Sequence, residues 1–229
     1  MKKFTKILIA SLMVSMTQAN SVEFSLGASG TAGFFDLSGS ETRSESGSLI
    51  RETSKSDEAY IGYGSIFGEI HLPYNLRFGL NHVPYALESE TTESTHTSKT
   101  LAQGGTGEAD RAQNVQVDLE NITTAYLSIY NEMGLYIKAG LIAGDLITNE
   151  SLATGSSYGN ADLEGYLIGA GYEKNLDNGL FIRAEMNYTD FEDIVLTSTP
   201  SGSGDSHTNT IDLNSVEGYT GSISIGKTF

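Results

Sequence analysis

The C-terminal stretch Tyr219-Thr220-Gly221-Ser222-Ile223-Ser224-Ile225-Gly226-Lys227-Thr228-Phe229 decides the fold class, because apolar and polar residues alternate along it. The same alternation reaches back through Asp212 and Leu213. A period of two residues is typical of a β-strand with one apolar and one polar face, whereas an amphipathic helix repeats apolar residues at i, i+3, i+4 and i+7. The stretch therefore predicts a β-strand whose two faces meet different environments.

The same period divides most of the chain into eight predicted strands. They cover residues 22–35, 59–72, 76–87, 113–130, 134–148, 161–174, 179–196 and 209–229. In the fourth segment, Val117 and Leu119 share a parity with Leu127, and Asp118 and Glu120 take the other parity. The second, third and sixth segments show a weaker pattern, which we attribute to glycine at many of their inward positions.

The connections between these segments alternate between short and long. Short turns are predicted at residues 73–75, 131–134 and 175–179, where Pro, Asn, Asp and Gly supply the backbone angles of a reversal. Long loops rich in Ser, Thr, Gly and Glu are predicted at residues 36–58, 88–112, 149–160 and 197–208. Short turns at one end and long loops at the other are typical of an outer-membrane β-barrel.

We therefore expect an all-β fold, an eight-stranded antiparallel transmembrane up-and-down β-barrel with short periplasmic turns and long extracellular loops. A strand in a bilayer has no water for its backbone groups, so a spanning sheet must close on itself with its apolar face toward lipid. A soluble β-sandwich also has alternating strands. The regular alternation of turn lengths favours the barrel.

The N-terminus resembles a secretory signal peptide. Lys2, Lys3 and Lys6 precede a short apolar run over residues 7–14, and Ala19 ends a small-residue cleavage site. The apolar run is shorter than the roughly 20 residues that a membrane helix needs. We expect residues 1–19 to be a cleaved signal peptide and residues 20–229 to form one barrel domain, exported to the outer membrane.

Composition excludes several classes of function. The chain has 13 Lys and Arg and 29 Asp and Glu, so loss of the three signal-peptide lysines leaves 10 basic against 29 acidic residues, a net charge of −19. Such an acidic chain is a poor nucleic-acid binder. Cysteine is absent, which excludes a disulfide framework and a thiolate metal site. We expect neither a metal nor a cofactor.

The inward parity predicts a charged lumen. With eight strands the interior is just wide enough to be filled by side chains, and unpaired charges there are costly. The predicted lumen charge network comprises Glu23, Arg77, Asp118, Glu120, Lys138, Glu173, Arg183 and Glu185. Two interpretations remain open: a structural plug of ion pairs, or a gate whose ion pairs rearrange and pass small ions.

The last strand resembles the terminal β-signal of outer-membrane proteins, carried here by Tyr219, Gly221, Ile223, Ile225 and Phe229. The resemblance is to small OmpA-like and opacity-type barrels of the porin family, without a periplasmic domain. It implies recognition by the barrel-assembly machinery and contact with outer-membrane lipids and lipopolysaccharide. A monomer is expected.

The sequence does not point to catalysis. His71 adjoins a periplasmic turn, His96 and His207 lie in long loops, and His82 precedes Val83-Pro84. We expect a structural or surface protein that is not an enzyme. A narrow passive channel for small ions, and adhesion or partner binding through the acidic loops, are the alternatives.

Overall fold

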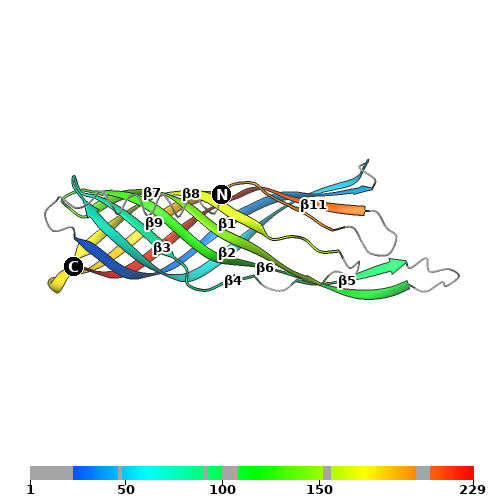
Figure 1. Ribbon diagram of the computed structural model, residues 1–229, viewed down its shortest axis with the longest axis horizontal. Coiled ribbons are helices and arrows are strands. Elements are labelled where there is room, and N and C mark those ends of the chain that lie inside the picture. The colour runs from blue at the N-terminus through cyan, green and yellow to red at the C-terminus, as the bar shows by residue number, and fades with distance from the viewer. Residues whose placement is uncertain (1–22, 46–47, 90–91, 100–107, 152–155, 200–206) are drawn as a thin grey trace.

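The chain folds into one antiparallel sheet that closes into a ring of eight strands (Figure 1). The computed structural model describes residues 23–45, 48–89, 92–99, 108–151, 156–199 and 207–229. The predicted signal peptide lies outside these residues. Within them, no helix is long and apolar enough to cross a membrane.

The ring follows the order of the chain. Its strands are β1 (Phe24–Glu45), β2 (Ser48–Leu72), β3 (Leu76–His82), β6 (Glu108–Tyr130), β7 (Leu135–Ser151), β8 (Ala161–Asn175), β9 (Leu180–Phe191) and β11 (His207–Thr228). Three short strands continue this wall: β4 (Leu87–Glu88) and β5 (Thr92–Lys99) pair with β6, and β10 (Ile194–Thr197) pairs with β11.

The first and last strands close the ring along their whole length. Their register runs from Ser25 opposite Thr228 to Glu45 opposite His207. At the C-terminal end, the Phe24 and Phe229 rings stack with centroids 5.0 Å apart, and the Phe229 N–H donates to the Phe24 carbonyl at 2.8 Å. The predicted eight-stranded antiparallel barrel is therefore confirmed.

The short turns lie at the end of the barrel that also holds the C-terminus (Figure 1, left). Tyr74 and Asn75 take positive φ angles of 65° and 59° in the first turn. In the second turn the side-chain oxygen of Asn131 accepts hydrogen bonds from the backbone N–H groups of Met133 and Leu135. Asparagine tolerates these backbone conformations, which explains why these turns could be read from the sequence.

Exposure alternates along the strands as the period-2 pattern predicts. In β9, Ile182 and Met186 are exposed whereas Arg183, Glu185 and Asn187 are buried. Apolar residues face outward and charged residues face inward, the opposite of a water-soluble sandwich.

Several details of the sequence-based prediction were wrong. The loop predicted at residues 88–112 contains β5 and the start of β6, and the segment predicted at residues 179–196 is interrupted between β9 and β10. The loop predicted at residues 36–58 is largely strand, because β1 runs to Glu45 and β2 begins at Ser48. The third segment leaves the sheet at His82. The glycines Gly62 and Gly64 of the second segment lie on the same face as exposed Ile66, so they face outward.

A β-bulge in β6 explains a further difference. The register between β6 and β7 shifts by one residue between Glu120 and Thr123, at Asn121, whose φ is +54°. A one-residue shift moves every following side chain to the other face. Val117 and Leu119 consequently face inward, beside Leu146 of β7.

Candidate functional site

Four charges from four strands, three of them buried and the fourth, Arg77, partly buried, form a closed ion-pair cluster near the end of the barrel that carries the short turns. Arg183 of β9 donates to Glu69 of β2 at 2.8 and 2.9 Å, and to Glu173 of β8 at 2.8 Å. Arg77 of β3 donates to both oxygens of Glu173, at 2.8 and 2.9 Å, and approaches Glu69 at 3.4 Å. Two guanidinium groups and two carboxylates bond in paired geometry, so the cluster is electrically neutral.

Aromatic rings pack against this cluster. Tyr126 donates to Glu69 at 2.8 Å, and the Arg77 guanidinium lies 3.9 Å from the centre of the Tyr130 ring. Phe181 is fully buried, and its ring lies 5.1 Å from the Arg183 guanidinium. Arginine stacks readily on such rings while keeping its hydrogen bonds in plane. The ring of charges is therefore both hydrogen-bonded and packed.

A second ion pair lies directly above the first cluster. Lys138 of β7 pairs with Glu185 of β9, and its ammonium group lies 4.8 Å from the Tyr126 ring centre. Tyr136 donates to Glu185 at 2.6 Å and Asn187 donates to it at 2.9 Å. Together the two layers hold three cations and three carboxylates.

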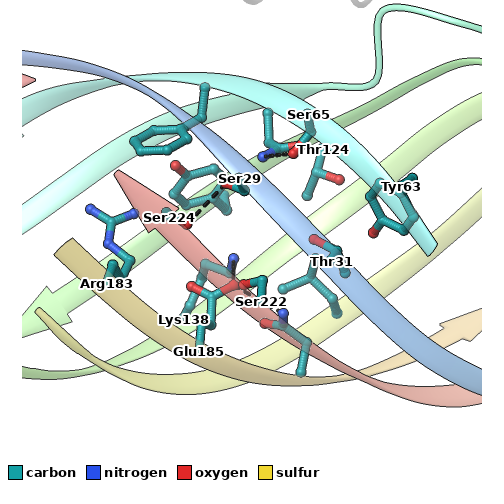
Figure 2. Close-up of a pocket in the computed structure, with 15 residues that line it drawn as sticks. Ser29, Thr31, Tyr63, Ser65, Thr124, Lys138, Arg183, Glu185, Ser222 and Ser224 are labelled. Atoms are coloured by element: carbon teal, nitrogen blue, oxygen red, sulfur yellow. Dashed lines mark hydrogen bonds and ion pairs between the residues drawn. The ribbon is translucent and has the colours of Figure 1, made fainter. Parts of the chain in front are cut away.

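A small polar chamber of about 50 Å³ adjoins the Lys138–Glu185 pair. Figure 2 shows Arg183 toward one end of it and Tyr63 toward the other, with the hydroxyl groups of Ser29 and Ser224 between them, joined by a 2.9 Å hydrogen bond. A water needs roughly 10–15 Å³ of such volume, so the chamber fits a few waters and no larger solute.

On the side of the chamber away from the short turns, the inner face of the wall is apolar. Leu146, Leu163, Ile194 and Leu196 form a buried hydrophobic cluster. Inward side chains of β6 and β11 pack against it: Val117, Leu119, Ile211 and Leu213. Phe191, which also packs against it, lies 6.0 Å from the ring of Phe35 of β1. The polar chamber thus lies between a layer of ion pairs and a layer of apolar side chains.

The structure brings together five of the predicted lumen residues: Arg77, Lys138, Glu173, Arg183 and Glu185. The other three lie apart from them.

Glu23 is exposed at the rim of the barrel that carries the short turns, where its carboxylate lies 3.4 Å from His71. Because of the β6 bulge, Asp118 and Glu120 lie on the opposite face from Leu119, away from the lumen. Asp118 accepts there from Gln116 and Asn149. The bulge is the physical reason that these two acids were misplaced.

Glu69 is the central carboxylate that sequence reasoning missed. Its side chain is 0% exposed, and it accepts from Arg183 and Tyr126. The parity of Phe67 and Glu69 against Ile66 and Ile70 contained the signal. It was hidden because the neighbouring glycines were assigned to the wrong face.

The β-signal residues lie on the outward face of β11. Tyr219, Ile223, Ile225 and Phe229 are exposed, and a Cβ added at Gly221 would meet no atom within 4 Å.

One cluster at the same rim has the residue types of a hydrolytic triad. Ser25 Oγ lies 2.8 Å from His71 Nε2, and His71 Nδ1 lies 3.4 Å from Glu23. Ser25 is 0% exposed and also bonds Thr228 at 2.8 Å. A nucleophile must reach its substrate, so this geometry serves to link β1, β2 and β11.

No protein-family model matches the sequence, and no curated protein matches it. Among solved structures, the chain is similar to the outer membrane protein OprG from Pseudomonas aeruginosa. The TM-score is 0.54 at 12% identity, over 91% of this chain and 96% of that chain.

It also matches the outer membrane protease OmpT from Escherichia coli, with a TM-score of 0.46 at 10% identity, over 93% of this chain and 100% of that one. The match to Ail of Yersinia pestis has a TM-score of 0.33 at 11% identity, over 83% of this chain and 98% of that one. Sequence identities this low indicate a shared fold and give no information about function. The closed ring of eight strands and the likeness to OprG show that the chain has the fold of the small outer-membrane β-barrel proteins.

Proposed function

We propose that this chain is an integral outer-membrane protein with a sealed barrel, which acts through the surface it presents outside the cell. The observation that carries the proposal is the neutral, buried cluster of Glu69, Arg77, Glu173 and Arg183. An ion that crossed the lumen would have to break several charge-assisted hydrogen bonds between these four side chains.

The outward face supports insertion in a membrane. Phe34, Tyr60, Tyr188 and Tyr219 lie in one row across four neighbouring strands, and Ile223 and Ile225 follow toward the periplasmic end. Aromatic residues concentrate at the headgroup level of a bilayer, with aliphatic residues between the two interfaces. This row therefore marks the outer interface, and everything beyond it is proposed to be extracellular.

Export by a cleaved signal peptide, assembly through the β-signal and contact with lipopolysaccharide complete this proposal. Two seals in series, the ion pairs and the apolar cluster, favour it over the narrow channel that the charged lumen also suggested.

The test is single-channel conductance of the refolded protein in a planar bilayer at neutral pH. We expect no discrete steps. Insertion is verified independently by protection of the barrel from protease and by its altered gel mobility before heating. Glu69→Ala combined with Arg183→Ala removes one cation and one anion from the first seal, and this variant should also show no steps because the apolar cluster remains. Regular steps from the unmodified protein would overturn the sealed barrel.

A further inference from the structure

The outer half of β2 has a strand partner on one edge and none on the other within the described residues. Along one edge β2 pairs with β1 from Ser48 to Ile70. Along the other edge it pairs with β3 from Ile66 to Leu72 only, because β3 ends at His82. An unpaired edge presents a row of backbone donors and acceptors that can template another strand.

The direction of these backbone groups follows from two hydrogen bonds. The N–H of His71 donates to the carbonyl of Glu23, so odd-numbered residues of β2 bond toward β1. The N–H of Gly64 donates to the hydroxyl of Tyr85, so even-numbered residues bond toward the other edge. The register with β1 has no shift between Arg51 and Ile70. The groups without a strand partner beyond the aromatic row therefore belong to Glu52, Ser54, Ser56 and Glu58, and the N–H of Glu58 among them donates to the side chain of Asp57 at 3.0 Å.

The side chains of the same even positions lie on the outward face of a small sheet formed by β2, β1 and β11. The register places the residues of this face in rows: Glu58, Asp36 and Glu217; Ser56, Ser38 and Ser215; Ser54, Ser40 and Asp212; Glu52, Thr42 and Thr210. Five of them are acidic, the others are hydroxyl residues, and none is basic. We call these positions the acidic face.

The basic side chains of the β1–β2 hairpin take the other parity. Arg51 and Lys55 occupy odd positions, and Lys55 pairs there with Asp57 at 3.2 Å. The acidic face therefore receives no compensation from the cations of its own hairpin. A hollow of about 480 Å³ lies along it, lined by residues that include Asp36, Ser56 and Glu58. This hollow is large enough to take long side chains.

We propose that the free edge of β2 binds an extended cationic peptide segment, which adds as an antiparallel strand and lays its basic side chains on the acidic face. Backbone hydrogen bonds supply the affinity in this mode of recognition, and alternate side chains supply the specificity. Residues opposite each other on one face bring their Cβ atoms within about 5.5 Å, so lysines opposite Glu52 and Glu58 would be direct neighbours of these acids. The inference rests on the proposed extracellular position of this hairpin.

A second copy of the chain does not fit this edge. Two barrels inserted in the same direction are related by an axis along the membrane normal, which leaves both β2 strands running the same way and crossed by twice their tilt. Strands tilted by about 35–45° would then cross at about 70–90°, far from the alignment that a ladder requires. The partner is therefore a separate extended segment.

The test uses the full-length barrel in zwitterionic micelles and a decapeptide of alternating lysine and threonine, followed by fluorescence anisotropy. In the proposed register the lysines lie opposite the even residues of β2, and their N–H groups face the protein. Methylation of the backbone nitrogens of the lysines removes these donors and leaves the side-chain charge unchanged. We expect the affinity of the peptide for the barrel to fall at least about tenfold. N-methylation of the threonines, whose N–H groups face away, should change it less than about threefold.

Two variants test the same edge from the protein side. Ser56→Pro removes a free-edge donor and leaves the pairing with β1 intact, because the N–H of an even residue points away from β1. Ser56→Pro should weaken binding of the lysine peptide about as much as methylation of the lysine backbone nitrogens does. Ser56→Ala keeps the N–H and should leave the binding unchanged. A peptide of alternating glutamate and threonine should fail to bind.

Three results would overturn the proposal: no binding of the lysine peptide, equal loss from both N-methylated peptides, or equal binding of the glutamate peptide. None of these depends on whether the barrel conducts, so failure here is distinguishable from failure of the sealed barrel.

Discussion

Replacing Arg183 with methionine should destabilise the barrel far more than removing any exposed cation. The Arg183 side chain is 4% exposed and donates three hydrogen bonds of 2.8–2.9 Å to Glu69 and Glu173. Without it, Arg77 faces two carboxylates alone, and Glu69 keeps Tyr126 and one 3.4 Å contact with Arg77. Removal of one partner of a buried ion pair typically costs about 3–5 kcal/mol.

The same reasoning predicts that a second change partly reverses the first. Glu69→Gln alone should also cost about 3 kcal/mol, because it leaves Arg183 without a full counter-charge. The double variant retains Arg77 and Glu173, which bond in bidentate geometry and balance each other. The double variant, Arg183→Met with Glu69→Gln, should therefore lose less free energy of unfolding than the two single variants together, by at least about 2 kcal/mol.

The assay is urea unfolding in lipid vesicles, followed by far-UV circular dichroism because the chain has no tryptophan. Lys174→Met is the matched control: Lys174 is exposed, follows Glu173 directly and has the opposite parity. It should change the free energy of unfolding by less than about 1 kcal/mol. Additive losses in the double variant, or an Arg183→Met loss no larger than the control, would refute the idea that the charges act as one cluster.

Two further outcomes follow from contacts nearer the end of the barrel opposite the short turns. A side-chain hydrogen bond from Lys55 holds the pKa of exposed Asp57 below its ordinary value, so any stability from this pair is present above the ordinary carboxylate pKa and is lost as pH falls through the lowered one. Lys55→Gln should raise the Asp57 pKa in an NMR titration, and an unchanged titration would disprove the contact. Tyr85→Phe removes the hydroxyl bonded to the Gly64 N–H. It should cost about 1 kcal/mol in the urea assay, and a neutral result would show that water replaces this bond.

The sequence predicted the membrane-spanning strands because lipid imposes a two-residue period on them. The same physics explains the loop prediction that was wrong. Outside the bilayer both faces of a hairpin meet water, so residues 36–45 and 48–58 are mostly Ser, Thr, Gly and charged residues, and their few apolar residues follow no parity. Backbone pairing between β1 and β2 holds these residues in strands, and backbone pairing leaves no hydrophobic pattern to read.

The residues of the candidate site were predictable only on strands where inward and outward side chains alternate without a bulge or a run of glycines. Arg183 and Glu185 lie on β9, whose pattern has no interruption, and both were assigned to the lumen. Asp118 and Glu120 were misplaced because the bulge at Asn121 adds a single residue, and a period-2 pattern cannot reveal on which side of such an insertion the phase is correct. Glycine has no side chain to mark a face, which is why Glu69 was overlooked among the glycines of β2.

The distribution of charge separates the part of the molecule that stabilises the barrel from the part that can attract a partner. The full chain carries a net charge of −16, yet the layers of Arg77, Arg183 and Lys138 against Glu69, Glu173 and Glu185 sum to zero. The excess of acid must therefore lie outside these layers, and the acidic face beside the free edge of β2 holds a concentrated part of it. Exposed charges act over about 10 Å at 0.1 M salt, whereas a neutral buried cluster has little field beyond its own contacts. A cationic segment approaching from outside would thus be drawn to the hairpin and not to the lumen, and added salt should slow its association without loosening the barrel.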